Sequence, residues 1–546
     1  MIDYKISEGI LVKVETNETN ITLPEGIKKI ARHAIPDIVQ SIVIPTTVTE
    51  IPDSVFAHTN VQEVILHAGI VSIGNDAFRG SRIKTITIPS SCAVIAPGAF
   101  YHCLHLREVK FAEGLNVILD GAFERCISLK EITIPSSVCY IGPRAFKNCE
   151  SLTFVKLPEQ LTSISSSCFE GCKTMHVVGL PSNLKSVGTA SFKDCSALSQ
   201  IALPDTIEEL GDKAFYGCLA METLTLPNTI THISDNCFGH CSKIRELELP
   251  NSVKYIGKGA FFSCQLLEIV KLPESIEEID DEAFASCTRL TVIQLPSTLK
   301  RIGASAFSNC RRLVGINIPP NAELGVSMCS RCHNLQQVTV TEGVKVIPAG
   351  AFSECTLLRS ILLPSTLEVI GKSVFSMCPS IQCIKFPNGL KEIGDYAFYN
   401  CTALKEVSIP NSVKAIGNHS FYSCRSLSKI AIPASVTELG IDVFEPTVKA
   451  FADTGTVGYH YACNHHLSVY PYSAFNDSNT GAVADNILSD ANRMDARATI
   501  ELLYDPNICM YLATAGISDM VGHLTQKFGE TTTYSNEAAL KILKGE

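Results

Sequence analysis

The sequence lacks several features that would assign a function directly. It contains no tryptophan, only 18% of its residues are charged, and no apolar run approaches the roughly 18 residues that a membrane-spanning helix needs. It also lacks an excess of basic residues, because the formal net charge is −10. A net acidic chain is a poor match for nucleic-acid phosphates. The composition therefore predicts neither a membrane-spanning segment nor a nucleic-acid partner.

Motifs of common catalytic sites are missing as well. The chain has no Gly-rich phosphate loop, no G-x-S-x-G nucleophile elbow and no H-E-x-x-H zinc motif. Residues 1–15 do not combine a basic region with a following apolar region, so we predict no secretory signal peptide. These absences predict a protein that is not an enzyme and uses no cofactor.

What the chain does contain is one unit repeated many times. Leu129–Cys149 reads LKEITIPSSVCYIGPRAFKNC, and close copies occur at Leu198–Cys218 and Leu404–Cys424. A phenylalanine marks the same slot in nearly every copy, with a step of 23 residues apart from two early steps of 22. Ile35 and Cys329 fill this slot in two further copies, which gives 19 turns. The marking residues are Phe56, Phe78, Phe100, Phe123, Phe146, Phe169, Phe192, Phe215, Phe238, Phe261, Phe284, Phe307, Phe352, Phe375, Phe398, Phe421 and Phe444.

Each recurring residue has a physical interpretation. Ile132 and Ile134 alternate with polar residues, as in a short half-buried strand. Ser137 occupies a slot that is Ser, Thr or Asn in most copies, which predicts a polar ladder of side chains that bond to backbone groups. Gly142 permits a bend closed to most residues, and Phe146 fills the interior. One unit cannot bury its apolar side alone. Stacked at about 4.8 Å per turn, the units predict a solenoid on the order of 90 Å long.

The pattern LxxIxLPxSLxxIGxxAFxxC resembles the BspA-like leucine-rich repeat, a class known from bacterial surface antigens and some protists. The resemblance covers about residues 21–470. It implies a mostly β repeat solenoid of the α+β kind, a leucine-rich-repeat arc of about 19 turns. Because the family includes adhesins that bind host matrix proteins or other bacteria, it also implies a protein partner and a cell-surface or secreted location.

Cysteine usage points to a different compartment. The chain has 23 cysteines, and most of them follow the marking phenylalanine by three residues. Disulfide scaffolds have irregular spacings, so this regular file predicts buried free thiols that pack as small hydrophobes. Free thiols favour a reducing compartment such as the cytoplasm. The file consists of Cys103, Cys126, Cys149, Cys172, Cys195, Cys218, Cys241, Cys264, Cys287, Cys310, Cys332, Cys355, Cys378, Cys401 and Cys424.

The flanks of the array differ from it in composition. Tyr4–Ile6 and Ile10–Val14 flank Glu8-Gly9 and predict a capping hairpin. After the solenoid we expect a closing cap made of a strand, a short helix and a strand. Beyond it, a polar linker leads to four short helices. The predicted divisions are an N-terminal cap at 1–20, the solenoid at 21–446, a C-terminal cap at 447–470, a linker at 471–481 and a small helical segment at 482–546.

Two groups of residues could ligate a metal, and each has a simpler structural explanation. Cys329 and Cys332 form a CxxC, but Cys332 belongs to the thiol file and Cys329 replaces a core phenylalanine. The other group lies within seven residues on the predicted cap and lacks two separated ligand pairs. We therefore assign no metal, and we leave open whether that second group binds one. Its members are His460, Cys463, His465 and His466.

The outward strand positions are the natural place for a binding surface. In each L-x-x-I-x-L segment they are the third and fifth residues, where acidic and basic side chains are nearly balanced. Phe154 is the one aromatic residue among them, and interface hot spots favour aromatic residues. We name Phe154, Lys156, Val177 and Gly179 as the candidate partner-binding residues. The alternative is that these are tolerated surface positions.

Three functions are compatible with these predictions. The first is a non-catalytic scaffold that binds a macromolecular partner, a protein, along the solenoid surface. The second is a cell-surface adhesin or secreted host-directed effector of the BspA type. The third makes the C-terminal helical segment the active part and the solenoid its targeting arm. The sequence predicts neither the partner's identity nor the oligomeric state.

Overall fold

The structure is a computed structural model that describes residues 2–475. The chain divides into two units, Met1–Tyr470 and Pro471–Glu546. Within the second unit a 3-10 helix, η1 (Tyr472–Phe475), lies in the predicted linker. The four helices predicted after residue 482 lie outside the described residues, as does Cys509.

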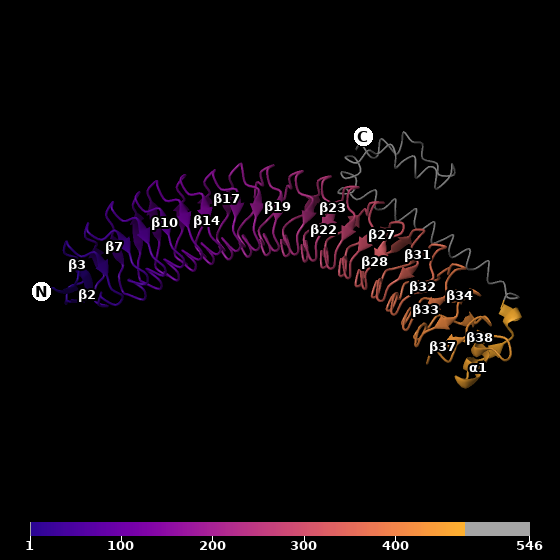
Figure 1. The fold of residues 1–546 in the computed structure, drawn as a ribbon. Helices are drawn as coiled ribbons and strands as arrows, with labels where there is room; N and C mark the ends of the chain where they lie inside the picture. Colours follow the sequence, from indigo (N-terminus) through magenta and orange to yellow (C-terminus); the bar gives the residue numbers. More distant parts are fainter. Residues whose placement is uncertain (1, 476–546) are drawn as a thin grey trace, which may run out of the picture. The chain divides into compact units, whose positions relative to one another are not determined.

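The first unit is a β-solenoid of about 20 turns, which confirms the predicted fold class. The turns follow one another in a curved row, with the strands arranged along it (Figure 1). Most turns contribute one strand from the L-x-x-I-x-L segment and one from the segment before the glycine. Parallel pairing between successive turns forms two rows, which we call the first and the second row.

The first row contains β3 (Asn20–Thr22), β5 (Ser41–Val43), β7 (Glu63–Ile65), β9 (Thr85–Ile88), β11 (Glu108–Phe111), β13 (Glu131–Thr133), β15 (Phe154–Lys156), β17 (Val177–Gly179), β21 (Glu246–Glu248), β23 (Ile269–Lys271), β25 (Val292–Ile293), β27 (Gly315–Ile318), β29 (Gln337–Val340), β31 (Ser360–Leu362), β34 (Glu406–Ser408) and β36 (Lys429–Ala431). The second row contains β4 (Lys29–Ile30), β6 (Glu50–Ile51), β8 (Ser72–Ile73), β10 (Val94–Ile95), β12 (Val117–Ile118), β14 (Tyr140–Ile141), β16 (Ser163–Ile164), β18 (Ser186–Val187), β19 (Glu209–Leu210), β20 (His232–Ile233), β22 (Tyr255–Ile256), β24 (Glu278–Ile279), β26 (Arg301–Ile302), β28 (Glu323–Leu324), β30 (Val346–Ile347), β32 (Val369–Ile370), β33 (Glu392–Ile393), β35 (Ala415–Ile416) and β37 (Glu438–Leu439).

The two ends of the solenoid depart from the repeat. At the start, β1 (Asp3–Ser7) and β2 (Ile10–Glu15) pair antiparallel, and β2 then pairs parallel with β4. At the far end, β38 (Lys449–Phe451), the helix α1 (Val457–Asn464) and β39 (Val469–Tyr470) follow one another. The Tyr461 hydroxyl accepts a hydrogen bond from the Val443 amide at 2.7 Å. The Tyr461 ring also meets the Phe444 ring edge-on at 6.0 Å. Helix α1 therefore covers the last turn.

The rings of the marking phenylalanines stack into a column with one interruption. It has two runs, from Phe56 to Phe307 and from Phe352 to Phe444. Consecutive rings lie nearly parallel, with centroids 4.9–5.8 Å apart. All of these side chains are buried. Stacked aromatic pairs add to the free energy already gained by burial, so the column is a central part of the core, together with the buried Ile, Leu, Val and Cys residues around it.

Two ladders of side chains run beside the column. The Ser137 hydroxyl donates to the Leu115 carbonyl of the preceding turn at 2.7 Å, and Thr206 donates to Leu184 at 2.7 Å. This is the predicted polar ladder. The file thiols form a second one, because each of the 15 donates to a carbonyl of the preceding turn at 2.9–3.3 Å. The file cysteines are therefore hydrogen-bond donors as well as buried hydrophobes.

Each turn also needs left-handed backbone on both sides of the phenylalanine. In the turn of Phe146, Arg144 and Asn148 both have φ of 57°. The same two slots recur along the array, and glycine fills some of them, as at Gly98 and Gly121. Gly142 is not among the residues with left-handed backbone, so another cause closes this position to most residues. A Cβ there would lie 2.7 Å from the Asp120 nitrogen, so glycine is required by the close approach of two turns.

The turn that interrupts the column compensates for the missing ring. Most turns carry Ala-Phe at this point, whereas here Met328 and Cys329 are both fully buried. The larger Met328 replaces alanine where the smaller Cys329 replaces phenylalanine. Phe307 and Phe352 lie in the turns on either side. The pair thus keeps the interior filled with a similar total of side-chain volume.

This compensation predicts a specific rescue. Cys329→Phe alone adds a ring to a filled space and should destabilise the protein by about 1–3 kcal/mol. Combining it with Met328→Ala restores the common Ala-Phe pair and should recover most of that loss. Urea unfolding of the single and double variants measures the difference. A double variant no more stable than Cys329→Phe would contradict the compensation.

Candidate interaction surfaces

The four predicted partner-binding residues lie together on two adjacent strands of the first row. Phe154 pairs with Val177 and Lys156 pairs with Gly179, in the parallel register of β15 and β17. Val155 between them points inward and is fully buried. Phe154 is 45% exposed and Val177 is 40% exposed. The structure therefore places two large apolar side chains side by side on the surface, and we call these four residues the strand patch.

The neighbours of the strand patch set its limits. On β13, Glu131 pairs with Phe154 and Thr133 pairs with Lys156. On the other side the first row is interrupted, because residues 200–202 and 223–225 form no strand before β21. Gly179 has no side chain to cover the stem of Lys156. The strand patch therefore borders the interruption of the first row, with an acidic residue on its other flank.

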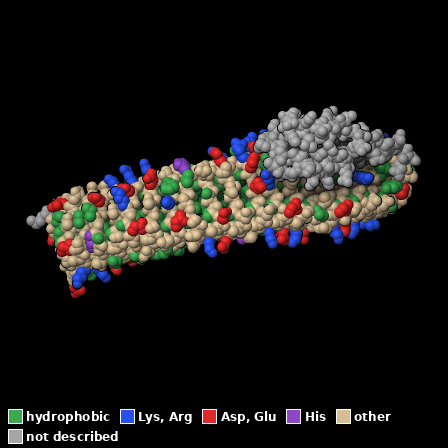
Figure 2. Space-filling model, turned by 90° about the horizontal axis from the view of Figure 1, so that it is seen from above, with side chains coloured by type: hydrophobic (Ala, Val, Ile, Leu, Met, Phe, Trp, Pro, Cys, Tyr) green, Lys and Arg blue, Asp and Glu red, His purple; other side chains and the backbone are tan. Residues whose placement is uncertain are grey.

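Charges on the rest of this row largely offset one another. Lys271 lies 3.3 Å from Glu248 on the neighbouring strand, and Lys429 lies 3.7 Å from Glu406. In space-filling view, acidic and basic side chains are interspersed along the visible face (Figure 2). Such a surface does not select a partner of one strong charge, so the apolar pair is the feature that distinguishes the strand patch.

A second surface feature, which the sequence analysis did not predict, is a set of aromatic side chains. It lies on the edge of the solenoid that carries the residues flanking the ring column. In several turns an aromatic residue directly follows the marking phenylalanine and is half-buried at the surface. The signal in the sequence was the dipeptide Phe-Tyr or Phe-Phe. These residues are Tyr101, Tyr216, Phe262, Tyr399 and Tyr422.

The densest group on this edge contains four rings. Tyr396 stacks on His419 at 5.0 Å, and Tyr399 stacks on Tyr422 at 6.4 Å. Edge-on contacts join the two stacks, with Tyr396 against Tyr399 at 5.8 Å and His419 against Tyr422 at 5.7 Å. Asp442 lies at the end of the group, 3.8 Å from the His419 Nε2. The four rings therefore form one contiguous aromatic group at the surface.

The possible metal ligands are distributed as follows. Cys329 and Cys332 are fully buried, and burial raises the pKa of the Cys329 thiol well above its ordinary value. His460 and Cys463 belong to α1, while His465 stacks on Tyr461 at 4.0 Å. Within residues 2–475, no three His, Cys, Asp or Glu side chains are grouped in a way that could hold a metal ion. In the same part of the chain, no helix has the length and apolarity to cross a membrane.

The stacked turns define the class of protein as a leucine-rich-repeat solenoid. A model of the BspA type leucine rich repeat region (6 copies) matches residues 13–130, 116–245, 208–325 and 322–449. Together these matches cover most of the chain. The chain belongs to the BspA-type leucine-rich repeat family.

One solved structure agrees with this assignment. A leucine-rich repeat protein from Bacteroides ovatus is 30% identical over 62% of this chain and 87% of its own, with a TM-score of 0.58. A leucine rich cell surface protein from Faecalibacterium prausnitzii is 23% identical over 66% of this chain and 92% of its own, with a TM-score of 0.38. The search of curated proteins found no match. Proteins of this family are generally non-enzymatic scaffolds, and the fold is consistent with a protein-interaction or surface role.

Proposed function

We propose that this protein is a non-catalytic scaffold that binds a partner protein through the strand patch. The observation that carries the proposal is the exposed pair Phe154 and Val177, which lie in register on a surface whose other outward residues are mostly polar or charged. Isolated apolar residues are common on protein surfaces. Two adjacent large ones, beside an interruption in the first row, offer a partner a larger apolar contact.

The size of the strand patch is consistent with a hot spot surrounded by weaker contacts. Covering a Phe or Val side chain contributes about 1.5–3 kcal/mol relative to leaving it exposed. The long solenoid surface provides the remaining area, and Lys156 and Glu131 lie at the rim. Rim charges of this kind set the orientation and the association rate more than the affinity.

The proposal predicts the effect of one truncation. A pull-down with the full chain, followed by mass spectrometry, identifies the partner. Phe154→Ala should then weaken its binding by roughly 30-fold, since hot-spot truncations cost about 2 kcal/mol or more. Leu362→Ala is the matched control, because Leu362 on β31 is also an outward residue and is 40% exposed. An unchanged dissociation constant for Phe154→Ala would refute the strand patch.

Two experiments separate this function from the others that the sequence raises. Surface proteolysis of intact cells tests the adhesin or effector, because a surface protein is cleaved and an internal one is protected. Deletion of residues 471–546 tests the idea that the C-terminal segment is the active part. If partner binding and the cellular effect both survive the deletion, that idea is wrong.

A further inference from the structure

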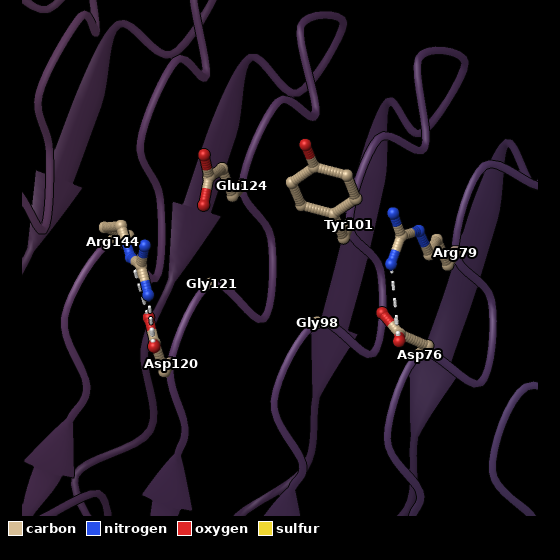
Figure 3. A pocket seen from close by; sticks show the side chains of 8 residues that line it. All are labelled: Asp76, Arg79, Gly98, Tyr101, Asp120, Gly121, Glu124 and Arg144. Atoms are coloured by element: carbon tan, nitrogen blue, oxygen red, sulfur yellow. Dashed lines mark hydrogen bonds and ion pairs between the residues drawn. The ribbon is translucent and has the colours of Figure 1, made fainter.

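A polar pocket lies on the edge that flanks the ring column, in the N-terminal third of the solenoid. Its volume is about 220 Å³, and residues from four consecutive turns surround it (Figure 3). The lining residues are Asp76, Arg79, Gly98, Tyr101, Asp120, Gly121, Glu124 and Arg144.

Two glycines create the hollow. Gly98 and Gly121 occupy the left-handed slot two residues before Phe100 and Phe123, with φ of 63° and 59°. The turns on either side carry Asp76 and Arg144 in the same slot, with φ of 52° and 57°. The backbone of this slot therefore accepts large side chains. At the two central turns the side chain is missing. The Asp76 carboxylate reaches over Gly98, where a Cβ would lie 2.5 Å from its Oδ1, and the room that remains is beside Gly121.

The two guanidinium groups of the pocket are already engaged. Arg144 donates from Nε and Nη2 to the two carboxylate oxygens of Asp120, at 3.2 and 2.6 Å. Arg79 lies over the Tyr101 ring at 4.9 Å and 3.5 Å from Asp76. Figure 3 shows these two ion pairs at opposite ends of the pocket, with Tyr101 and Glu124 between them.

Glu124 is the lining carboxylate that forms no ion pair with Arg79 or Arg144, since Figure 3 shows no ion pair between it and the other lining residues. Its carboxylate lies over Gly121, because a Cβ added at Gly121 would be 3.3 Å from Glu124 Oε2. Partial burial raises the pKa of this carboxyl, although Arg144 and Lys147 act in the opposite direction. A partly desolvated carboxylate is stabilised by a cation brought close to it.

We propose that this pocket binds an organic cation, the ammonium or guanidinium group of a lysine or arginine side chain, between Tyr101 and Glu124. The lining has three carboxylates and two guanidiniums. The guanidiniums already face Asp76 and Asp120, which leaves the Glu124 carboxylate to meet the incoming cation. The Glu124 carboxylate accepts hydrogen bonds from the ligand, and the Tyr101 ring provides an aromatic surface that attracts cations. The pocket is separate from the strand patch and does not depend on it.

The ligand class is tested by titrating the full chain with small probes. The probes are blocked Gly-Lys-Gly and Gly-Arg-Gly peptides, the uncharged blocked Gly-Gln-Gly, and free cadaverine, each measured by calorimetry at low ionic strength. A basic peptide should bind at one site at least tenfold more tightly than the glutamine peptide, and added salt should weaken it. Cadaverine binding as tightly as the peptides would support the cation site and assign it to free amines. Equal affinity for the glutamine peptide would overturn the proposal.

Two substitutions test the location. Glu124→Gln keeps the shape of the side chain, removes its charge and should weaken the basic peptide at least tenfold. Gly121→Lys places an alkylammonium inside the pocket and should abolish binding. The slot tolerates lysine, because Lys213 occupies it with φ of 56°.

Matched controls come from distant turns. Gly259 has the same slot and φ of 58°, so Gly259→Lys should leave the affinity unchanged. Glu445 directly follows the marking phenylalanine, as Glu124 does, and Glu445→Gln should also have no effect. Wild-type affinity in Gly121→Lys would refute the pocket. Phe154→Ala should not change peptide binding. The peptide titration therefore tests the pocket independently of the strand patch, which is tested by partner binding.

Discussion

Replacing Phe215 by alanine should destabilise the solenoid by about 3–5 kcal/mol, the range found for buried Phe truncations. Phe215 is fully buried. Its ring stacks on Phe192 and on Phe238, with centroids 5.5 Å away on each side. The substitution removes both stacking contacts and leaves a void. The neighbouring turns cannot close it, because each is held in place by backbone hydrogen bonds to the turn of Phe215. The loss is therefore large.

Urea unfolding followed by circular dichroism measures this loss, with hydrogen exchange to locate it. Each turn of a solenoid contacts only its neighbours, so exchange should rise most in the turns around Phe215. Phe154→Ala is the control, since that ring is 45% exposed. A destabilisation below about 1 kcal/mol for Phe215→Ala would mean that the Phe215 ring does not pack as a buried core residue.

The second large effect is unfolding at alkaline pH. Burial raises the pKa of most file thiols, to about 12 for Cys149, Cys264 and Cys378, against 9.0 for an unperturbed thiol. A thiol whose folded pKa is raised keeps its proton in the folded state while the unfolded state releases it. Above pH 9 the unfolded state is therefore increasingly favoured, and below pH 9 these thiols have no effect on stability.

The magnitude follows from the number of thiols. Each buried thiol that ionises only on unfolding removes about 1.4 kcal/mol of stability per pH unit between its unfolded and folded pKa. Because most turns between Cys103 and Cys401 carry such a thiol, their effects combine within any group of turns that unfolds together. We expect the urea midpoint, measured under reducing conditions, to fall steeply from pH 9 to pH 11.

A set of Cys→Ser substitutions is the matched control. Serine at Cys149, Cys172, Cys195 and Cys218 keeps a donor for the carbonyl of the preceding turn but does not ionise in this range. The four-serine variant should lose stability less steeply with pH than the wild type, whatever its stability at pH 7. The same slope in both proteins would show that the thiols do not cause the alkaline unfolding.

Much of the fold could be predicted from the repeat alone. The 23-residue phase identified Phe146 and Cys149 as buried, and the alternation of Ile132 with polar residues identified a strand. The same alternation placed Phe154 and Val177 on the outside. These predictions concern the direction of a side chain within its own turn, which the local pattern determines.

Other features could not be predicted from a single unit. Gly142 was interpreted as permitting a bend closed to most residues, and the cause is that the backbone of the preceding turn leaves no room for a side chain there. The thiols were interpreted as packing groups, whereas each also donates to a carbonyl one turn away. The exchange of volume between Met328 and Cys329 depends on the rings of the neighbouring turns. Each of these depends on contacts between turns.

The sequence by itself determined the period, the interior and the family, because these depend on which residues recur. Only the tertiary structure decided which variable residues become neighbours. Stacking brings Phe154 beside Val177, and it brings Gly98 and Gly121 together between Asp76 and Arg144, although each pair of neighbours is separated by 22 or 23 residues in the chain. The reason is that parallel stacking in register places equivalent slots about 5 Å apart. A surface on this protein is therefore built from one residue of each successive turn.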